Sequence, residues 1–115
     1  MRIMRGMIIT RIKKMSERRL YQIFKDKITA ADPNCWVYKI PDWVGGGKRP
    51  FDTILIIQGI PFAVEFKSEK GKLTKYQSYQ LTDFINAGGQ ALIFWDGDDD
   101  MEKFIKKIME IVNGK

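Results

Sequence analysis

The chain has 115 residues, of which 44% are hydrophobic and 30% are charged. This composition is typical of one folded domain and excludes wholesale disorder. Histidine is absent and Cys35 is the single cysteine, which excludes histidine zinc sites, Ser-His-Asp triads and an intramolecular disulfide. No apolar run approaches the roughly 20 residues of a membrane span, and no signal-peptide pattern is present. We therefore expect an intracellular protein with no membrane partner, either cytoplasmic or a viral protein acting inside a host cell.

The net charge of +6 is concentrated at the N-terminus. Residues 1–19 contain one acid, Glu17, and the bases Arg2, Arg5, Arg11, Lys13, Lys14, Arg18 and Arg19. We expect residues 1–14 to form a basic N-terminal arm that contacts a polyanion, most commonly nucleic acid. Three alternatives stay open: a solvated tail, a membrane-surface arm, or a chain whose true start is Met15.

Hydrophobic periodicity and turn residues predict the order α-β-β-β-α-β-α. Ser16 caps a first helix that ends at Asp32-Pro33-Asn34. Residues 35–40 form a strand, and a glycine-containing loop over 41–50 follows it. Residues 51–57 and 61–67 form two strands joined by a tight turn around 58–60. The first half of the chain is therefore a helix followed by three strands.

The second half adds a helix, a strand and a helix. After a loop over 68–73, Thr74 caps a helix that ends at Gly88-Gly89. Residues 90–95 form a short apolar strand, and residues 101–112 form an amphipathic closing helix that carries Phe104, Ile105, Ile108 and Val112 on one side. The fold class is α/β, in a single domain.

Glu17 has an unusual predicted position on the first helix. At 100° per residue it falls in the middle of the apolar stripe formed by Tyr21, Phe24 and Ile28. A carboxylate in that stripe is expected to be buried and needs a partner or a chemical role.

The central hairpin contains the pattern D-x(12)-E-x-K, formed by Asp52, Glu65 and Lys67. With a loop of two or four residues, the antiparallel partner of Asp52 is Glu65 or Lys67. Glu65 and Lys67 are two residues apart, so they share one face of the sheet. Burying charges costs several kcal/mol each even when they are paired. A functional site is therefore favoured, and a structural lysine–carboxylate pair is the alternative.

Carboxylate and carbonyl oxygens suit Mg²⁺ or Mn²⁺, whereas zinc is disfavoured in a chain without histidine. Such an ion polarises a phosphoryl oxygen and activates a water molecule. Lys67 would offer positive charge to the nucleophile or to the negative charge that develops on phosphate. Phosphodiester hydrolysis is the reaction that uses all of these groups.

Several segments together resemble the PD-(D/E)XK nuclease superfamily. The resemblance covers residues 16–95 and rests on Glu17-Arg18-Arg19-Leu20, Lys48-Arg49-Pro50-Phe51-Asp52, Val64-Glu65-Phe66-Lys67-Ser68, Gly71-Lys72-Leu73-Thr74-x-x-Gln77 and Ala87-Gly88-Gly89. Within the superfamily the chain is most similar to VRR-NUC-type nucleases, and it is also similar to archaeal Holliday junction resolvases. The resemblance implies a restriction-endonuclease-like α-β-β-β-α-β core over residues 16–95, followed by a closing helix over 99–112, within a nuclease domain of residues 15–115.

The resemblance also implies roles for individual residues. Glu17, Asp52, Glu65 and the backbone of Phe66 would surround the metal ion, Lys67 would be catalytic, and Gln77 would support the site. Phe51 separates Pro50 from Asp52, where the family usually has adjacent proline and aspartate. The pair Pro41-Asp42 is a rival, but it lies in a loop without the constraint of the hairpin.

Weaker signals have structural explanations of their own. Gln77 completes a capping box with Thr74. The segment Gly45-Gly46-Gly47-Lys48 is not a Walker A loop, because Arg49 stands where serine or threonine is required. Residues 96–100 fail as a calcium loop and are expected to cap the closing helix. Trp43 is either a lid or a base-stacking platform.

The sequence therefore predicts a Mg²⁺- or Mn²⁺-dependent DNA endonuclease that acts on branched or Holliday junction DNA, in DNA repair or recombination. The alternative is a non-catalytic nucleic-acid-binding module with the same fold. Expected DNA-binding residues are Lys13, Lys14, Arg18, Lys48, Arg49, Lys72 and Lys75. A homodimer is expected, with its interface on residues 7–9 or on Phe104, Ile108 and Val112 of the closing helix.

Overall fold

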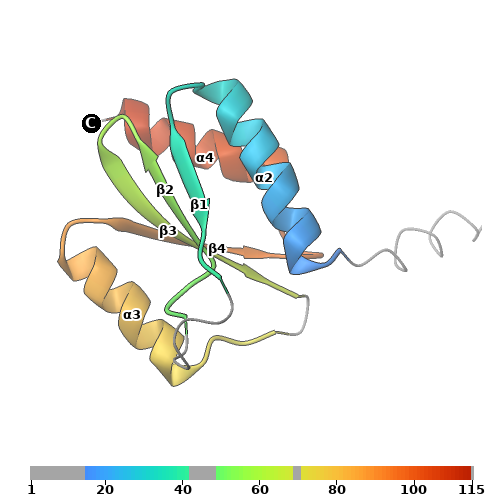
Figure 1. The fold of residues 1–115 in the computed structure, drawn as a ribbon, viewed down its shortest axis with the longest axis vertical. Coiled ribbons are helices and arrows are strands. Elements are labelled where there is room, and N and C mark those ends of the chain that lie inside the picture. Colours follow the sequence, from blue (N-terminus) through green and yellow to red (C-terminus); the bar gives the residue numbers. More distant parts are fainter. Residues whose placement is uncertain (1–14, 42–48, 69–70, 115) are drawn as a thin grey trace, which may run out of the picture.

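A four-stranded mixed sheet forms the centre of the computed structural model, which describes residues 15–41, 49–68 and 71–114 (Figure 1). The strands lie side by side in the order β1 (Trp36–Lys39), β2 (Thr53–Ile57), β3 (Ile60–Lys67) and β4 (Gln90–Trp95). Strand β2 is antiparallel to both β1 and β3, whereas β4 is parallel to β3. A parallel pair needs a crossover connection, and the helix that follows β3 provides it.

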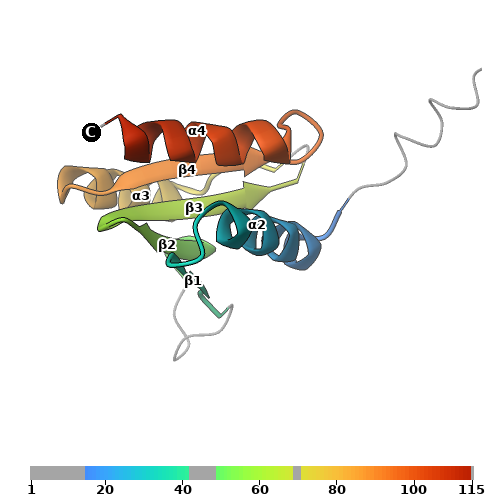
Figure 2. The same ribbon diagram turned by 90° about the horizontal axis from the view of Figure 1, so that it is seen from above.

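Within the described residues, three helices cover the two faces of this sheet (Figure 2). They are α2 (Glu17–Ala31), α3 (Lys75–Asn86) and α4 (Met101–Asn113). Side chains alternate along a strand: Phe62, Val64 and Phe66 of β3 pack with α2 and α4. Ala63 points the other way and packs with Leu81 of α3. The sheet is therefore a layer between α2 with α4 on one face and α3 on the other.

The larger core cluster is built around aromatic rings. Phe24 of α2 makes edge contacts with Phe66 of β3, at 5.6 Å between ring centroids, and with Phe104 of α4, at 6.0 Å. This contact fixes α2 and α4 against the strand that carries Glu65 and Lys67.

The apolar face of α4 is used inside the domain. Phe104, Ile108 and Val112 are 8%, 0% and 1% exposed and belong to the core. The prediction that these residues form a dimer interface is therefore wrong, because the stripe that the sequence shows is needed to cover the sheet. The other predicted interface, residues 7–9, lies outside the described residues, as does the whole basic arm over 1–14.

The β2–β3 turn sets the register of the site. Gln58 and Gly59 both have positive φ, 50° and 80°, as a two-residue type I′ turn requires. Ile57 pairs with Ile60, and the ladder continues to Thr53 opposite Val64. This register places Asp52 opposite Glu65, which is the pairing that a two-residue loop predicts.

The predicted order of elements is confirmed, and so is the α/β fold class. Strand β4 and the start of α4 have the expected bounds, whereas β1 and β2 are shorter than predicted at their ends. Asp100 caps α4 by accepting hydrogen bonds from the backbone N–H groups of Glu102 and Lys103, as expected. In the part of the chain that the structure describes, no helix is long and apolar enough to cross a membrane.

Candidate active site

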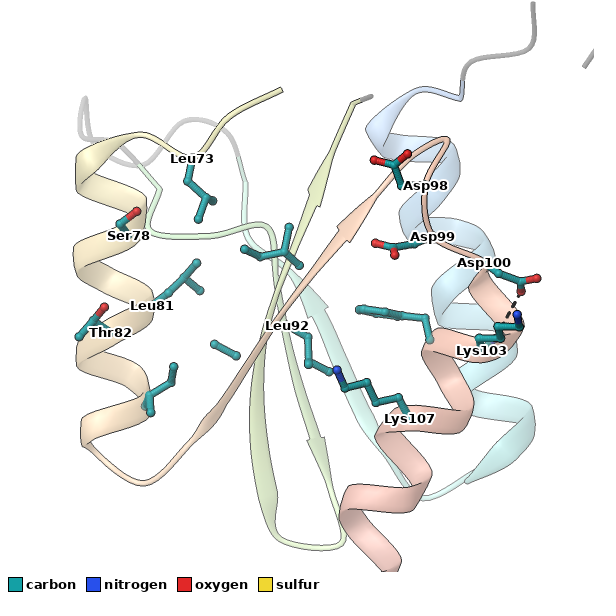
Figure 3. A pocket seen from close by; sticks show the side chains of 14 residues that line it. Leu73, Ser78, Leu81, Thr82, Leu92, Asp98, Asp99, Asp100, Lys103 and Lys107 are labelled. Carbon is teal, nitrogen blue, oxygen red and sulfur yellow. Dashed lines mark hydrogen bonds between the residues drawn. The ribbon is translucent and has the colours of Figure 1, made fainter. Parts of the chain in front are cut away.

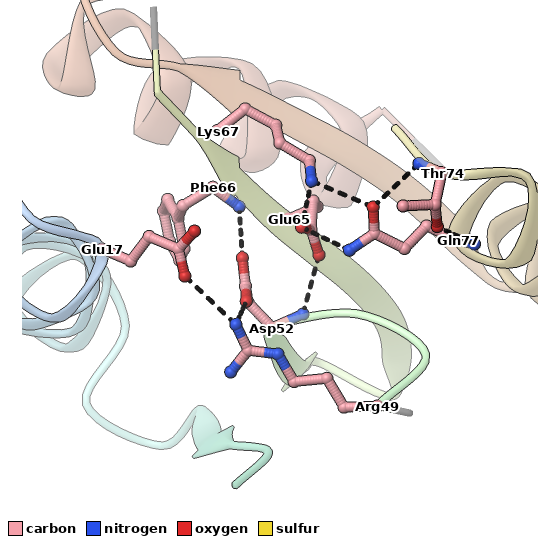
Figure 4. A network of polar contacts seen from close by, with 8 residues as sticks. All are labelled: Glu17, Arg49, Asp52, Glu65, Phe66, Lys67, Thr74 and Gln77. Atoms are coloured by element: carbon pink, nitrogen blue, oxygen red, sulfur yellow. Dashed lines mark hydrogen bonds and ion pairs between the residues drawn. The ribbon is translucent and has the colours of Figure 1, made fainter. Parts of the chain in front are cut away.

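Two carboxylates take over the hydrogen bonding where the β2–β3 ladder ends. Beyond Thr53, the backbone N–H of Asp52 donates to Glu65 Oε1 at 3.0 Å, and the backbone N–H of Phe66 donates to Asp52 Oδ2 at 2.7 Å (Figure 4). Both carboxylate side chains are 1% exposed. The two acids are thus fixed by backbone amides from opposite strands, which orients their remaining oxygens.

Lys67 and Gln77 complete one side of the cluster. Lys67 Nζ lies 3.2 Å from Glu65 Oε2 and donates to Gln77 Oε1 at 2.9 Å. Gln77 Nε2 donates to Glu65 Oε2 at 2.9 Å. The amide of Gln77 therefore holds the lysine and the glutamate together, which connects the sheet to α3.

Gln77 also has the structural role that the sequence predicts. Its side-chain Oε1 accepts a hydrogen bond from the Thr74 N–H at 3.1 Å, while its own N–H donates to Thr74 Oγ1 at 3.0 Å. This capping box fixes the first turn of α3. Gln77 caps the helix and contacts Lys67 at the same time, because its Oε1 accepts hydrogen bonds from both the Thr74 N–H and Lys67 Nζ.

Arg49 closes the other side of the cluster. Its Nη2 lies 3.1 Å from Glu17 Oε1 and also forms an ion pair with Asp52 Oδ1. Its Nη1 donates to the carbonyl oxygen of Ile40 at 3.2 Å. Figure 4 shows the guanidinium between Glu17 and Asp52. The Arg49 guanidinium therefore joins Glu17 and Asp52, which are two of the three carboxylates that the resemblance assigns to the metal ion.

Phe51, which stands between Pro50 and Asp52 where the family usually has adjacent proline and aspartate, has a structural role in this fold. Its side chain is 5% exposed, and its ring meets that of Phe84 of α3 edge-on at a centroid distance of 5.3 Å. The contact of Phe51 with α3 fixes the backbone immediately before Asp52, which helps to keep the Asp52 carboxylate buried.

The pKa of Glu65 is raised from its usual 4.5 to about 7, mainly by burial and secondly by the negative charge of Asp52. Lys67 and Arg49 act in the opposite direction, because their positive charges favour the carboxylate. The carboxyl group of Glu65 therefore changes its protonation state near neutral pH. A pKa shifted in this way is typical of functional sites.

The prediction that Glu17 lies in the buried stripe of the first helix is wrong. It occupies the first turn of α2 next to the N-cap Ser16, and its side chain is 49% exposed. The buried residues of α2 are Leu20, Phe24 and Ile28. The angle around a helix gives the direction of a side chain, but not how far along the helix the covering sheet extends. Glu17 nevertheless reaches the cluster through Arg49.

The other predicted site residues are divided between exposed positions and undescribed segments. Arg18, Lys72 and Lys75 are exposed, so they are available for contact with a phosphate backbone. Arg49 is instead enclosed among carboxylates. Predictions on Lys13, Lys14, Lys48, Asp42, Trp43 and the three glycines at 45–47 fall outside the described residues.

Lys39, at the end of β1, is a basic residue near the cluster that no motif of the sequence indicates. Lys39 pairs with Thr53, the neighbour of Asp52, and lines a hollow of about 400 Å³ together with Glu17, Arg18 and Tyr21. Its neighbour Ile40 donates its backbone N–H to the Asp52 carbonyl at 2.8 Å, which brings the end of β1 close to the cluster. The hollow extends from Glu17 and contains two cationic side chains.

A second hollow lies away from the carboxylate cluster, between α3 and α4 over β4 (Figure 3). Its volume is about 560 Å³, and its lining combines Leu81 and Leu92 with Lys103, Lys107 and residues 98–100. Asp52, Glu65 and Lys67 are not part of this lining. The residues to which the sequence assigns catalysis therefore lie at the open end of the β2–β3 hairpin and not in this hollow.

The residues present fit a divalent cation. Asp52 Oδ2 is engaged by the Phe66 N–H, whereas buried Oδ1 accepts no hydrogen bond from the described part of the chain and faces the positive charge of Arg49. Asp52 and Glu65 supply the hard oxygens that Mg²⁺ and Mn²⁺ prefer. Over residues 15–41, 49–68 and 71–114, however, no three acidic, cysteine or histidine side chains are gathered as a metal-binding group. Glu17 in particular is joined to Asp52 by Arg49 and not by direct proximity.

The raised pKa of Glu65 predicts a pH-dependent stability in the absence of divalent cations. A carboxyl group with a raised pKa in the folded state favours folding below its unfolded value of 4.5, and this contribution is lost as the pH rises through about 7. Glu65→Gln cannot titrate. We therefore expect the melting temperature of Glu65→Gln to rise relative to that of the unmodified protein between about pH 5 and about pH 8.

Thermal unfolding followed by circular dichroism in EDTA measures this difference. Glu110→Gln, an exposed glutamate of α4, is the matched control and is expected to melt in parallel with the unmodified protein at every pH. Parallel curves for Glu65→Gln as well would contradict the raised pKa.

Comparison with known proteins establishes the fold. No protein-family model and no curated protein matches the chain. A solved structure described as "VRR_NUC domain" is similar, with a TM-score of 0.61 and 22% identity over 82% of this chain and 94% of that chain. The resemblance to a VRR-NUC-type nuclease is thereby confirmed at the level of the fold, and the protein has the fold of a VRR_NUC domain.

Proposed function

We propose that this protein is a metal-dependent DNA endonuclease that hydrolyses phosphodiester bonds. The observation that carries the proposal is the buried pair Asp52 and Glu65 with Lys67 Nζ 3.2 Å from Glu65 Oε2. Burying two carboxylates costs stability even when Lys67 and Arg49 pair with them. The same three residues carry the resemblance to the PD-(D/E)XK superfamily, and the VRR_NUC fold supports a nuclease-type function.

Each residue of the cluster has a distinct proposed role. Asp52 and Glu65, with the backbone of Phe66, would hold Mg²⁺ or Mn²⁺, which supplies a positive charge that polarises phosphate and lowers the pKa of water. In hydrolysis, a water molecule loses a proton to solvent as its oxygen bonds to phosphorus, the bond from phosphorus to a sugar oxygen breaks, and the leaving sugar oxygen takes up a proton from solvent. Lys67 provides positive charge beside the reacting phosphate. Gln77 positions Lys67 and Glu65 through its two hydrogen bonds.

The proposed path of the DNA backbone follows the cations near this cluster. Arg18 and Lys39 line the hollow that adjoins Glu17, and Lys72 and Lys75 are exposed near the start of α3. Lys13, Lys14 and Lys48 are proposed to add contacts. Phosphate contacts position a protein on DNA without reading sequence. We therefore propose selection by DNA shape, with branched or four-way junction DNA as the substrate and DNA repair or recombination as the setting.

A homodimer is proposed because a branched substrate offers two strands, while the described residues of each chain form one such carboxylate cluster. A twofold axis would present two sites symmetrically. The exposed apolar side chains Trp36, Tyr38 and Ile56 form a patch that suits such an interface. Trp36 pairs with Ile56 across β1 and β2, and its ring stacks against Tyr38 at 5.6 Å.

Substitution of the cluster tests the chemistry. We expect Asp52→Asn, Glu65→Gln and Lys67→Ala each to reduce DNA cleavage by at least about a hundredfold, because the first two weaken the hold on the cation and the third removes positive charge beside the reacting phosphate. DNA binding should survive, since most phosphate contacts lie elsewhere. Cleavage rates with Mg²⁺, Mn²⁺ or EDTA and affinities by fluorescence anisotropy measure the two effects.

Lys106→Ala and Glu110→Gln are matched controls, because both residues are exposed on α4. Full cleavage by Asp52→Asn would place the metal ion elsewhere, with Asp42 the next candidate. Cleavage that survives EDTA would contradict metal dependence. An unmodified protein that binds DNA but does not cut it under any of these conditions would favour the alternative, a non-catalytic binding module.

The substrate proposal predicts faster cleavage of flap and four-way DNA than of linear duplex, with little dependence on base sequence, because shape and phosphate positions are read. End-labelled substrates of equal length and composition measure the rates. Light scattering of the free protein and of its DNA complex should give a dimer. Equal rates on linear and branched DNA would contradict structure selectivity, and a monomer in both states would contradict the dimer.

A further inference from the structure

Arg49 makes contacts that a DNA-binding arginine on an open surface would not make. A single nitrogen, Nη2, bridges Glu17 Oε1 at 3.1 Å and Asp52 Oδ1, while Nη1 donates to the Ile40 carbonyl at 3.2 Å (Figure 4). The Arg49 side chain is 14% exposed. The guanidinium is therefore held from three directions at the edge of the carboxylate cluster.

The charge of Arg49 compensates the cluster. Asp52 and Glu65 are buried side by side, and their mutual repulsion contributes to the raised pKa of Glu65. Lys67 lies beside Glu65, whereas Asp52 has Arg49 as its ion-pair partner. Each buried carboxylate thus has its own cationic partner.

The position of Arg49 also determines which oxygen it covers. Asp52 Oδ2 is taken by the Phe66 N–H at 2.7 Å, which leaves Oδ1 as the oxygen that can accept another cation. Arg49 lies against this Oδ1. A divalent ion bound to Asp52 and the guanidinium would therefore compete for the same atom.

We propose that Arg49 is an internal counter-ion, which occupies Asp52 in the metal-free protein and is released from it when a divalent cation binds. This inference rests on the proposed function, because it takes Asp52 as a ligand of the catalytic ion. Release would leave the guanidinium beside the cluster, where it can pair with a DNA phosphate. Metal binding would then prepare both the catalytic charge and a substrate contact.

Direct measurement of metal affinity tests the competition. Free Mn²⁺ gives a six-line electron paramagnetic resonance signal that is lost on binding, so a titration yields the dissociation constant without any DNA. We expect Arg49→Gln to bind Mn²⁺ at least about tenfold more tightly than the unmodified protein, because a competing charge in contact with Asp52 is removed. Arg49→Lys keeps the charge and should bind within about threefold of the unmodified protein.

Arg19→Gln is the matched control, since Arg19 is an exposed arginine of α2 and should not alter the affinity. An affinity that is unchanged or weaker in Arg49→Gln would overturn the inference and leave Arg49 as a structural clamp between Glu17 and Asp52. A structural clamp would change the melting temperature but would not strengthen metal binding.

A second measurement follows the guanidinium itself in the unmodified protein. In ¹⁵N-correlated spectra, the Arg49 Nε–H signal is assigned by its loss in Arg49→Lys, a variant that keeps the charge. We expect this signal to move on addition of Mg²⁺, and not to move in Asp52→Asn. If this signal does not move although the same protein binds Mn²⁺ saturably, the proposed release of Arg49 from Asp52 is overturned.

The failures of the two proposals are distinguishable. Tighter Mn²⁺ binding by Arg49→Gln together with no DNA cleavage would keep the counter-ion and refute the nuclease. DNA cleavage that requires metal, with unchanged Mn²⁺ affinity in Arg49→Gln, would keep the nuclease and refute the counter-ion. Absence of Mn²⁺ binding by every variant would refute both.

Discussion

The exchange of hydrogen bonds between Asp52 and the strand that carries Glu65 is the interaction on which the candidate site depends. Each carboxylate accepts a backbone N–H from the opposite strand, at 3.0 Å for Glu65 Oε1 and 2.7 Å for Asp52 Oδ2. These bonds satisfy donors that the sheet ladder leaves unpaired beyond Thr53. They exist only because the two-residue turn at Gln58-Gly59 fixes the register. A shift by one residue would turn one of the acids to the other face.

Two buried negative charges then determine the surroundings. Lys67 and Gln77 engage Glu65 from the side of α3, and Arg49 engages Asp52 and connects it to α2 through Glu17. The polar cluster thus joins helices from opposite faces of the sheet, while the aromatic core around Phe24 and Phe66 holds the sheet rigid beneath it. Such rigidity suits a site that must hold charges in fixed positions.

The sequence predicts the parts of the structure that local rules control. The tight turn around residues 58–60, the Thr74–Gln77 capping box and the spacing from Asp52 to Lys67 predict the element order and the convergence of Asp52, Glu65 and Lys67. The contact of Arg49 with Glu17 was not predictable, because a loop has no periodicity and the two residues are 32 positions apart. The apolar stripe of α4 was misinterpreted, since a stripe shows that a face is buried but not what covers it.

We propose that Asp52 and Glu65 hold a divalent cation in a nuclease site built on the VRR_NUC fold. Anomalous diffraction from crystals of the protein soaked in Mn²⁺ locates the ion without reference to activity. We expect a peak within bonding distance of Asp52 Oδ1 and of a Glu65 oxygen, with Lys67 close to it. A peak at other residues, or an Asp52 that remains paired with Arg49 while Mn²⁺ is bound elsewhere, would show that these two acids do not hold the ion.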